Sequence, residues 1–319
     1  MLFPLVCVLI LWIPVPWGSN RVWSWALLEV LVFCLLAFWA AVHVVRPLPL
    51  SDRDNIRFFL LSGLWLGYHA IYLLPFPNGL VSALAPATAE VYRAVDLLNG
   101  DKGIHYYLSV DRHATLVEML KGGAYLGLCY LVYEVLTSKR RLKVLLWLLL
   151  TMGVLQASFG MFASFTGLRL VPDSLTAGHW DLVIGTFVNR NHFSAHLAMA
   201  VAAGMALLLP HLSHGHRPAG WRGLLVRQAA WLSTTPGITV LMLVIVFAAL
   251  FASGSRGALA ALFSALCLAL LVIRVGRGPD ALELRIVPVV LLVLVGAVVL
   301  WSRRSRFLKT YPVNETPAG

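Results

Sequence analysis

The sequence predicts an all-α fold: a polytopic transmembrane helix bundle of about nine spans, each of which needs about 20 apolar residues. Of its 319 residues, 60% are hydrophobic and only 12% are charged. Soluble domains have about 45–50% apolar and about 25% charged residues. The mean hydropathy is +0.82, which excludes a disordered chain. The apolar runs are long and unbroken, whereas the strands of a transmembrane β-barrel alternate in polarity.

Apolar segments recur along the whole chain and give the expected spans in order. They are Leu2–Trp17, Val22–Val45, Phe58–Leu74, Thr115–Leu136, Val144–Phe165, Phe193–Leu209, Gly237–Ala252, Ala258–Val275 and Ile286–Trp301. We expect the first to be a retained helix rather than a signal peptide. It lacks a basic start and a small-x-small cleavage site, and it contains Trp12 and Trp17.

The basic residues of the loops predict the orientation, because cytoplasmic loops are enriched in lysine and arginine. They concentrate in alternate loops: Arg46, Arg53 and Arg57; Lys139, Arg140, Arg141 and Lys143; Arg217, Arg222 and Arg227; Arg274, Arg277 and Arg285. The N-terminus is then inside and the C-terminus outside. The basic stretch after the ninth segment, around Arg303 and Lys309, opposes this rule. We therefore attribute the net charge of +11 to cytoplasmic loops rather than to a nucleic-acid-binding surface, and we expect no nucleic-acid partner.

We predict one membrane domain over residues 1–301 and a basic polar tail over residues 302–319. Two outer loops, Pro75–Ala114 and Thr166–His192, are long, and long loops often carry function. We expect short helices over these outer loops. The four cysteines, Cys7, Cys34, Cys129 and Cys267, lie inside apolar runs without CxxC pairing. We interpret them as small hydrophobic residues rather than as a disulfide or metal site.

The stretch from Gly185 to His196 places an arginine, two amides and an imidazole at the outer start of the sixth span. Asn189 or Asn191 could cap that helix. The backbone N–H groups at a helix start, together with Arg190, make a natural anion site. A snorkelling interfacial arginine beside capping asparagines explains the stretch equally well.

A second stretch, Ser253-Gly254-Ser255-Arg256-Gly257-Ala258, joins the seventh and eighth spans with almost no linker. Arg256 then lies at or within the membrane surface, which costs a few kcal/mol unless the charge has a partner or water. The glycines allow a tight turn and a close approach to a ligand. The loop pattern places Arg190 and Arg256 on one face. Two guanidiniums there suit a doubly charged phosphate ligand, although a snorkelling arginine in a tight hairpin is the alternative.

These two motifs together resemble the O-antigen ligase and O-antigen polymerase superfamily. The pattern is Phe-x-Asn-x-Asn-His-Phe over residues 187–193, followed by Ser-x-Ser-Arg-Gly over residues 253–257. Upstream, Leu-Ser-Val-Asp-Arg-His-Ala-Thr over residues 108–115, before a Leu-rich helix that carries Lys121, is also similar. The resemblance covers residues 108–275.

The resemblance implies a bacterial inner-membrane enzyme that takes a glycan from undecaprenyl pyrophosphate at the periplasmic face. Ligases attach it to lipid A-core, polymerases to another repeat unit, and relatives to protein. It implies inversion at the anomeric carbon without a metal or nucleotide cofactor, and it assigns the pyrophosphate to Arg190 and Arg256. With the neighbouring polar groups, the predicted substrate-binding residues are Arg190, Arg256, Asn189, Asn191 and Lys121. The motifs do not choose between ligase and polymerase.

The ligases also use a histidine on a large periplasmic loop as the candidate base, and no histidine follows Trp301 here. We therefore expect this sequence to lack the C-terminal part of that fold, as a fragment, half of a split protein or a degenerate relative. A partner chain could supply the missing part. His192 is the alternative base, because an imidazole titrates near neutrality; packing or orientation of an amide is its other role.

Other polar residues are weaker candidates. His192 and His196 are four apart on one helix face, but a zinc site needs further ligands. The histidines around His214 fit a solvated cytoplasmic turn better than a metal tract. Glu118 and Lys121 could form an ion pair that cancels charge within the bundle, or could contact substrate. Asp173 and Asp181 could orient a sugar or simply be solvated.

Two other functions remain open. A transporter of an anionic lipid would also need membrane arginines, but it should show inverted repeats and broken helices near mid-membrane, and the sequence shows neither. A non-catalytic membrane subunit that binds lipid-linked glycan would need the same arginines without turnover.

Overall fold

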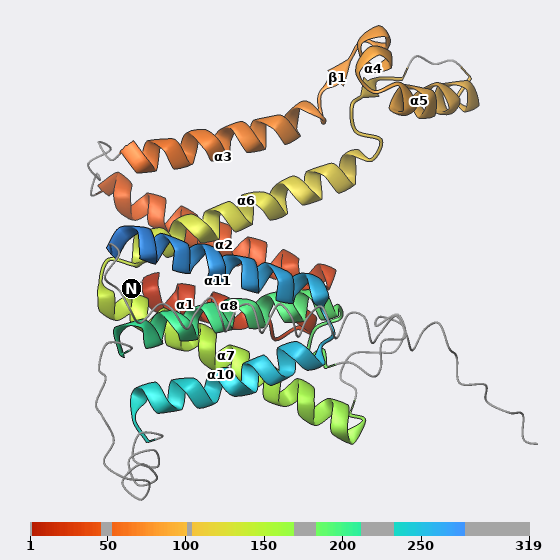
Figure 1. The fold of residues 1–319 in the computed structure, drawn as a ribbon. Helices are drawn as coiled ribbons and strands as arrows, with labels where there is room; N and C mark the ends of the chain where they lie inside the picture. Colours follow the sequence, from red (N-terminus) through yellow and green to blue (C-terminus); the bar gives the residue numbers. More distant parts are fainter. Residues whose placement is uncertain (1, 46–52, 101–103, 169–182, 212–232, 278–319) are drawn as a thin grey trace, which may run out of the picture. The chain divides into compact units, whose positions relative to one another are not determined.

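A computed structural model describes residues 2–45, 53–100, 104–168, 183–211 and 233–277, and these are mostly helical (Figure 1). The chain divides into two compact units. The first comprises Met1–Ile10 and Arg21–Arg141, and the second comprises Leu11–Asn20 and Leu142–Gly319. Each unit is described by itself.

The first unit contains four apolar helices: α1 (Leu2–Trp12), α2 (Val22–Val45), α3 (Arg53–Ile71) and α6 (Arg112–Val135). Both α2 and α3 pack against α6. Glycines of α6 make the close approach possible, as is typical between membrane helices. The indole of Trp65 on α3 occupies the space that a Cβ at Gly122 would need, and Leu36 on α2 lies against Gly127 in the same way.

The segment between α3 and α6, predicted as a long outer loop with short helices over it, is a small folded subdomain, and its short helices confirm that part of the prediction. It consists of β1 (Pro75–Phe76), α4 (Asn78–Leu84), α5 (Pro86–Leu98) and β2 (Tyr106–Tyr107). The two strands pair antiparallel, with Pro75 opposite Tyr107. Val81, Ala89 and Tyr106 form its buried core. We call residues 75–107 the α4–α5 subdomain.

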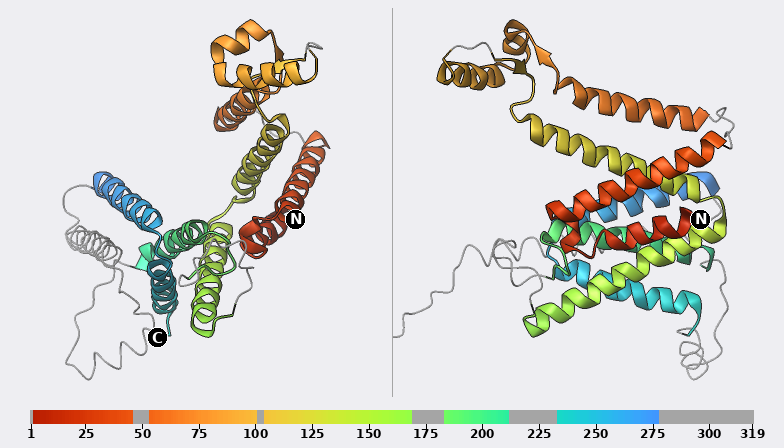
Figure 2. Two further views of the ribbon diagram at one scale, coloured as in Figure 1. Left: turned by 90° about the vertical axis from the view of Figure 1, so that its right-hand side faces the viewer. Right: turned by 180° about the vertical axis from the view of Figure 1, so that it is seen from behind.

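The second unit is built around α8 (Arg190–Leu208), which continues into η3 (Leu209–His211). In the view of Figure 2, left, α8 lies among α7 (Lys139–Thr166), α10 (Thr235–Ala252) and α11 (Arg256–Arg277). Gly153 of α7 meets Ala200 of α8 so closely that a Cβ on the glycine would overlap the alanine methyl. Phe193 and Leu197 of α8 are fully buried in the common core.

The first helix ends at Trp12, so the predicted span to Trp17 is too long. Pro14 and Pro16 follow, and a proline cannot donate a helical hydrogen bond. The chain then turns through η1 (Trp17–Ser19), in which all three residues have positive φ, at 52°, 62° and 55°. Pro14 and Thr186 both belong to the second unit, and the Pro14 carbonyl accepts a hydrogen bond from the Thr186 hydroxyl at 2.6 Å.

Each predicted span up to Val275 corresponds to a helix, and the ninth, Ile286–Trp301, lies outside the described residues. Within the described part, five helices are long and apolar enough to cross a membrane: Val22–Val45, Arg112–Val135, Lys139–Thr166, Arg190–His211 and Thr235–Ala252. Shorter apolar helices cover Leu2–Trp12, Ile56–Ile71 and Arg256–Ala269. The all-α membrane bundle is thus confirmed in outline. The count of nine and the orientation stay predictions.

Candidate functional site

The first predicted motif forms the start of α8. Asn189 is the N-cap: its Oδ1 accepts a hydrogen bond from the backbone N–H of Asn191 at 2.8 Å. Arg190 is therefore the first residue of the helix. Capping by an asparagine is the expected local outcome, because its side chain satisfies a backbone donor that has no partner within the helix.

The chain that leads into α8 is fixed to α7. The Gln156 side-chain oxygen accepts a hydrogen bond from the Thr186 N–H at 3.1 Å. The Thr186 hydroxyl also lies 3.1 Å from this oxygen, but its one proton is donated to the closer Pro14 carbonyl. Gly185 has φ +59°, and the Phe193 ring fills the space that a side chain there would need. Phe187 and Phe193 are buried, with ring centroids 5.9 Å apart. The roles of Gln156 and Thr186 were not predicted; the polar amide of Gln156 inside the apolar run of α7 was the available signal.

The second predicted motif forms the tight hairpin between α10 and α11. Ser253 is the C-cap of α10, Gly254 takes φ +68°, and Arg256 is the first residue of α11. Gly254 therefore supplies the left-handed turn for which a glycine was predicted. Ser253 and Ser255 are almost fully buried.

The structure brings the two motifs into direct contact. The Ser255 hydroxyl donates to Asn191 Oδ1 at 2.9 Å, across 64 residues of sequence. The hydroxyl oxygens of Ser194 and Ser253 lie 2.7 Å apart. Arg190 precedes Asn191 and Arg256 follows Ser255, so the two arginine-bearing segments lie in contact. The convergence of the two guanidinium groups on one ligand stays a prediction. We call Asn189–Ser194 together with Ser253–Gly257 the α8–α11 site.

Ser194 and Ser253 have two hydroxyl protons between them but make three short oxygen–oxygen contacts. Ser194 Oγ also lies 2.7 Å from the Arg190 carbonyl, and Ser253 Oγ lies 2.6 Å from the Leu250 carbonyl. Each hydroxyl has one proton. Two of these three short contacts are therefore hydrogen bonds at any one time, and the serines can exchange partners without moving.

The electrostatics of the α8–α11 site favour an anion. Two helix N-termini meet there, and each carries a partial positive charge. Both begin with arginine, and neither has an acidic residue in its first turn. Arg256 is exposed, and a Cβ built on Gly257 would meet nothing within 4 Å. The site therefore has open space beside a permanent cation.

The two histidines of α8 have different surroundings. His192 is exposed, in the first turn beside Asn191. His196 is buried, its ring centroid lies 5.6 Å from that of Phe187, and its Nε2 has no hydrogen-bond partner among the described residues. Within this part of the chain, no group of three or more His, Cys, Asp or Glu side chains is placed to hold a metal ion.

Lys121 belongs to α6 of the first unit. Its ammonium lies 2.6 Å from Glu118 Oε1 and 4.3 Å from the centre of the Trp25 ring. The predicted ion pair is thus confirmed, with a cation–π contact that the sequence did not suggest. The Lys121 side chain is only 20% exposed, whereas that of Glu118 is 65% exposed. Contact of Lys121 with substrate stays a prediction.

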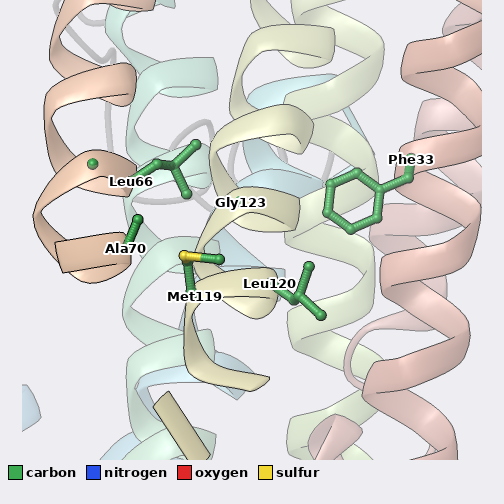
Figure 3. Close-up of a pocket in the computed structure, with 7 residues that line it drawn as sticks. Phe33, Leu66, Ala70, Met119, Leu120 and Gly123 are labelled. Atoms are coloured by element: carbon green, nitrogen blue, oxygen red, sulfur yellow. The ribbon is translucent and has the colours of Figure 1, made fainter. Parts of the chain in front are cut away.

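A groove in the first unit lacks the polar groups that orient a substrate (Figure 3). Its lining residues come from α2, α3 and α6: Phe33, Leu66, Gly67, Ala70, Met119, Leu120 and Gly123. All are apolar, so the groove can accept hydrocarbon but offers no side-chain hydrogen bond. The α8–α11 site is the better candidate for chemistry.

Comparison of the chain with protein-family models, with curated proteins and with solved structures found no match.

Proposed function

We propose that this protein transfers a glycan from an undecaprenyl-pyrophosphate carrier to an acceptor, in the assembly of O-antigen or exopolysaccharide. The reaction takes place at the periplasmic face of the bacterial inner membrane. The acceptor is lipid A-core for a ligase and another glycan for a polymerase. The observation that carries the proposal is the hydrogen bond from Ser255 to Asn191, because it joins the two arginine motifs at one point.

In the proposed reaction, Arg190 and Arg256 bind the pyrophosphate. An acceptor hydroxyl oxygen attacks the anomeric carbon opposite the bond to phosphate. That bond breaks, and its electrons pass to the pyrophosphate oxygen. Fixed guanidiniums and two helix N-termini stabilise the developing charge, and loss of one such group costs about 10²–10³-fold in rate. Arginine stays protonated throughout the physiological pH range, so its charge does not depend on pH.

The other residues support these two arginines. Asn189 acts through the helix cap, because its Oδ1 is used by the Asn191 N–H. Asn191 accepts from Ser255 through Oδ1, which leaves its Nδ2 as a donor toward a phosphate or sugar oxygen. His192 is exposed in the same turn and is the candidate base for the acceptor proton. Lys121 is the remaining proposed contact with substrate.

The test compares Arg190→Ala and Arg256→Ala with Arg140→Ala in lipid nanodiscs. Arg140 is an exposed arginine in the first turn of α7. The residues that lead into α8 contact α7 near its other end, where Gly160 lies against Gly185. The readouts are affinity for undecaprenyl pyrophosphate and transfer of a lipid-linked glycan. We expect both to fall in the first two variants and neither in the control.

Three results would count against the proposal. Unchanged transfer in both alanine variants refutes the enzymatic role. Binding that depends on the arginines, with no turnover on any acceptor, identifies a binding subunit instead. Transbilayer movement of the lipid without transfer identifies a transporter.

The orientation is tested with reporter fusions that are active only in the periplasm. Fusion near Thr176 should be active and fusion near His214 inactive; both positions lie outside the described residues. The reverse pattern would place the α8–α11 site on the cytoplasmic side.

A further inference from the structure

Helix α5 of the α4–α5 subdomain has two different apolar faces. One face packs inside the subdomain: Ala89 is fully buried, and the Tyr92 hydroxyl donates to the Ser109 carbonyl at 2.8 Å. The other is a stripe at the spacing of a single helix face. We call it the α5 stripe; it comprises Ala87, Val91, Ala94, Val95 and Leu98.

The α5 stripe is not covered by the first unit. Val91 is 45% exposed, Val95 is 40% exposed and Leu98 is 86% exposed. Leu84, at the end of α4 just before the stripe, is 64% exposed. An exposed apolar surface of this kind marks an interaction site.

Charged residues lie elsewhere on α5. Glu90 is exposed and lies about 140° around the helix from Val95, at 3.6 residues per turn. Arg93 donates to the Ser82 hydroxyl of α4 at 2.7 Å. Glu90 nevertheless borders the α5 stripe, about 40° from Ala94, and Leu97 beside it is 69% exposed. The outward side of α5 is thus an apolar stripe with charged groups at its border, as in helices that lie in a membrane interface.

The base of the subdomain is fixed directly to the ends of two apolar helices. The Ser109 N–H donates to the Tyr72 carbonyl at 3.3 Å, one residue beyond the end of α3 at Ile71. Figure 1 shows α4 and α5 beyond the adjoining ends of α3 and α6. Leu74 and Val110, on the two connections, are 52% and 58% exposed. Exposed apolar residues thus lie on both connections at the base of the subdomain, and the exposed Asp111, Arg112 and His113 follow Val110 at the start of α6.

We propose that the α5 stripe inserts into the interfacial region of the lipid bilayer and holds the α4–α5 subdomain against the membrane. The partner is lipid because the Ser109–Tyr72 hydrogen bond fixes the subdomain at the end of the apolar helix α3. A membrane interface also accepts a helix with one apolar and one charged edge, since charged groups stay at the level of water and headgroups.

The test uses spin labels on the full-length protein in nanodiscs of phosphatidylethanolamine and phosphatidylglycerol. The four native cysteines are replaced by alanine, and single cysteines are introduced as Val91→Cys, Val95→Cys and Glu90→Cys. Leu64→Cys on α3, where Leu64 is 70% exposed, provides the lipid reference. The measurement is the collision rate of each label with oxygen, which partitions into lipid, and with a water-soluble nickel chelate.

We expect labels at Val91 and Val95 to collide more with oxygen than with the chelate, as at Leu64, and the label at Glu90 to show the reverse. If the chelate dominates at Val91 and Val95, the stripe faces water and the proposal is wrong. If both reagents are excluded there, protein covers the stripe, which also overturns the proposal. The introduced cysteines all lie at exposed positions, and of the replaced native cysteines only Cys7 is half-buried. Helical content measured by circular dichroism confirms that each variant is folded.

Discussion

The contact between Asn191 and Ser255 can be measured by a double-mutant cycle. Ser255 is 2% exposed and donates to Asn191 Oδ1 at 2.9 Å. A hydrogen bond contributes a net free energy of about 0.5–1.5 kcal/mol, and cycles in a membrane protein average about 0.6 kcal/mol. Asn191 is exposed, so water replaces the lost partner when Ser255 becomes alanine. We therefore expect Ser255→Ala to lower the free energy of unfolding by about 1 kcal/mol, with a coupling of about 0.6 kcal/mol to Asn191→Ala.

The cycle requires the wild type, both single variants and the double variant, unfolded reversibly with a denaturing detergent in mixed micelles. Ser264→Ala, at an exposed position of α11, is the matched control for loss of a serine hydroxyl without loss of this contact. In the same proteins, the affinity for undecaprenyl pyrophosphate should fall less in Ser255→Ala than in Asn191→Ala, which also loses the proposed Nδ2 donor, and the double variant should match Asn191→Ala. Free energies that add within about 0.3 kcal/mol would show that the two residues are uncoupled and would refute the reasoning.

Ser194→Ala and Ser253→Ala should each lower the free energy of unfolding by only about 1 kcal/mol, because the remaining serine still donates its proton to a backbone carbonyl. A loss of several kcal/mol in either variant would contradict the sharing of two protons among three contacts. Gly153→Ala should lower it by about 1–3 kcal/mol through overlap with Ala200, whereas Gly63→Ala, where a Cβ meets nothing within 4 Å, should not; equal unfolding midpoints would disprove this. Burial raises the pKa of the Tyr92 hydroxyl, whose neutral form donates to Ser109. This contribution to stability should be complete below the unfolded pKa of about 10 and lost as pH rises through the higher folded pKa; phenolate absorbance checks it, and Tyr92→Phe should remove the high-pH transition.

Local features of the α8–α11 site followed from the sequence. Asn189 was a candidate cap because its side chain suits a helix start, and Gly254 was expected in the turn because a tight hairpin needs left-handed backbone. The ion pair of Glu118 and Lys121 followed from their spacing on one helix. Each depends on residues within one turn of each other.

Features that depend on register or on distant residues could not be predicted. The apolar run from Leu2 continues past Pro14, so hydropathy alone extended the first helix, whereas the missing proline N–H ends it. Short helices over the outer loops were predicted, and α4 and α5 confirm them between α3 and α6. The strand pairing was not predicted, because β1 and β2 have two residues each and give no periodic signal. The bond from Thr186 to Pro14 spans 172 residues and has no local signature.

The polar groups of the α8–α11 site are of two kinds: buried groups with hydrogen-bond partners in the protein, and exposed groups. Ser194, Ser253 and Ser255 are buried, and each hydroxyl has a partner within the protein, so these groups hold the helix ends in register. Asn191 and His192 lie in the exposed first turn of α8. A buried hydroxyl that is already bonded gains little from a ligand, whereas an exposed donor or cation can exchange water for it. Removal of the serines should therefore reduce ligand affinity only through stability and register, and removal of the exposed groups should reduce it directly.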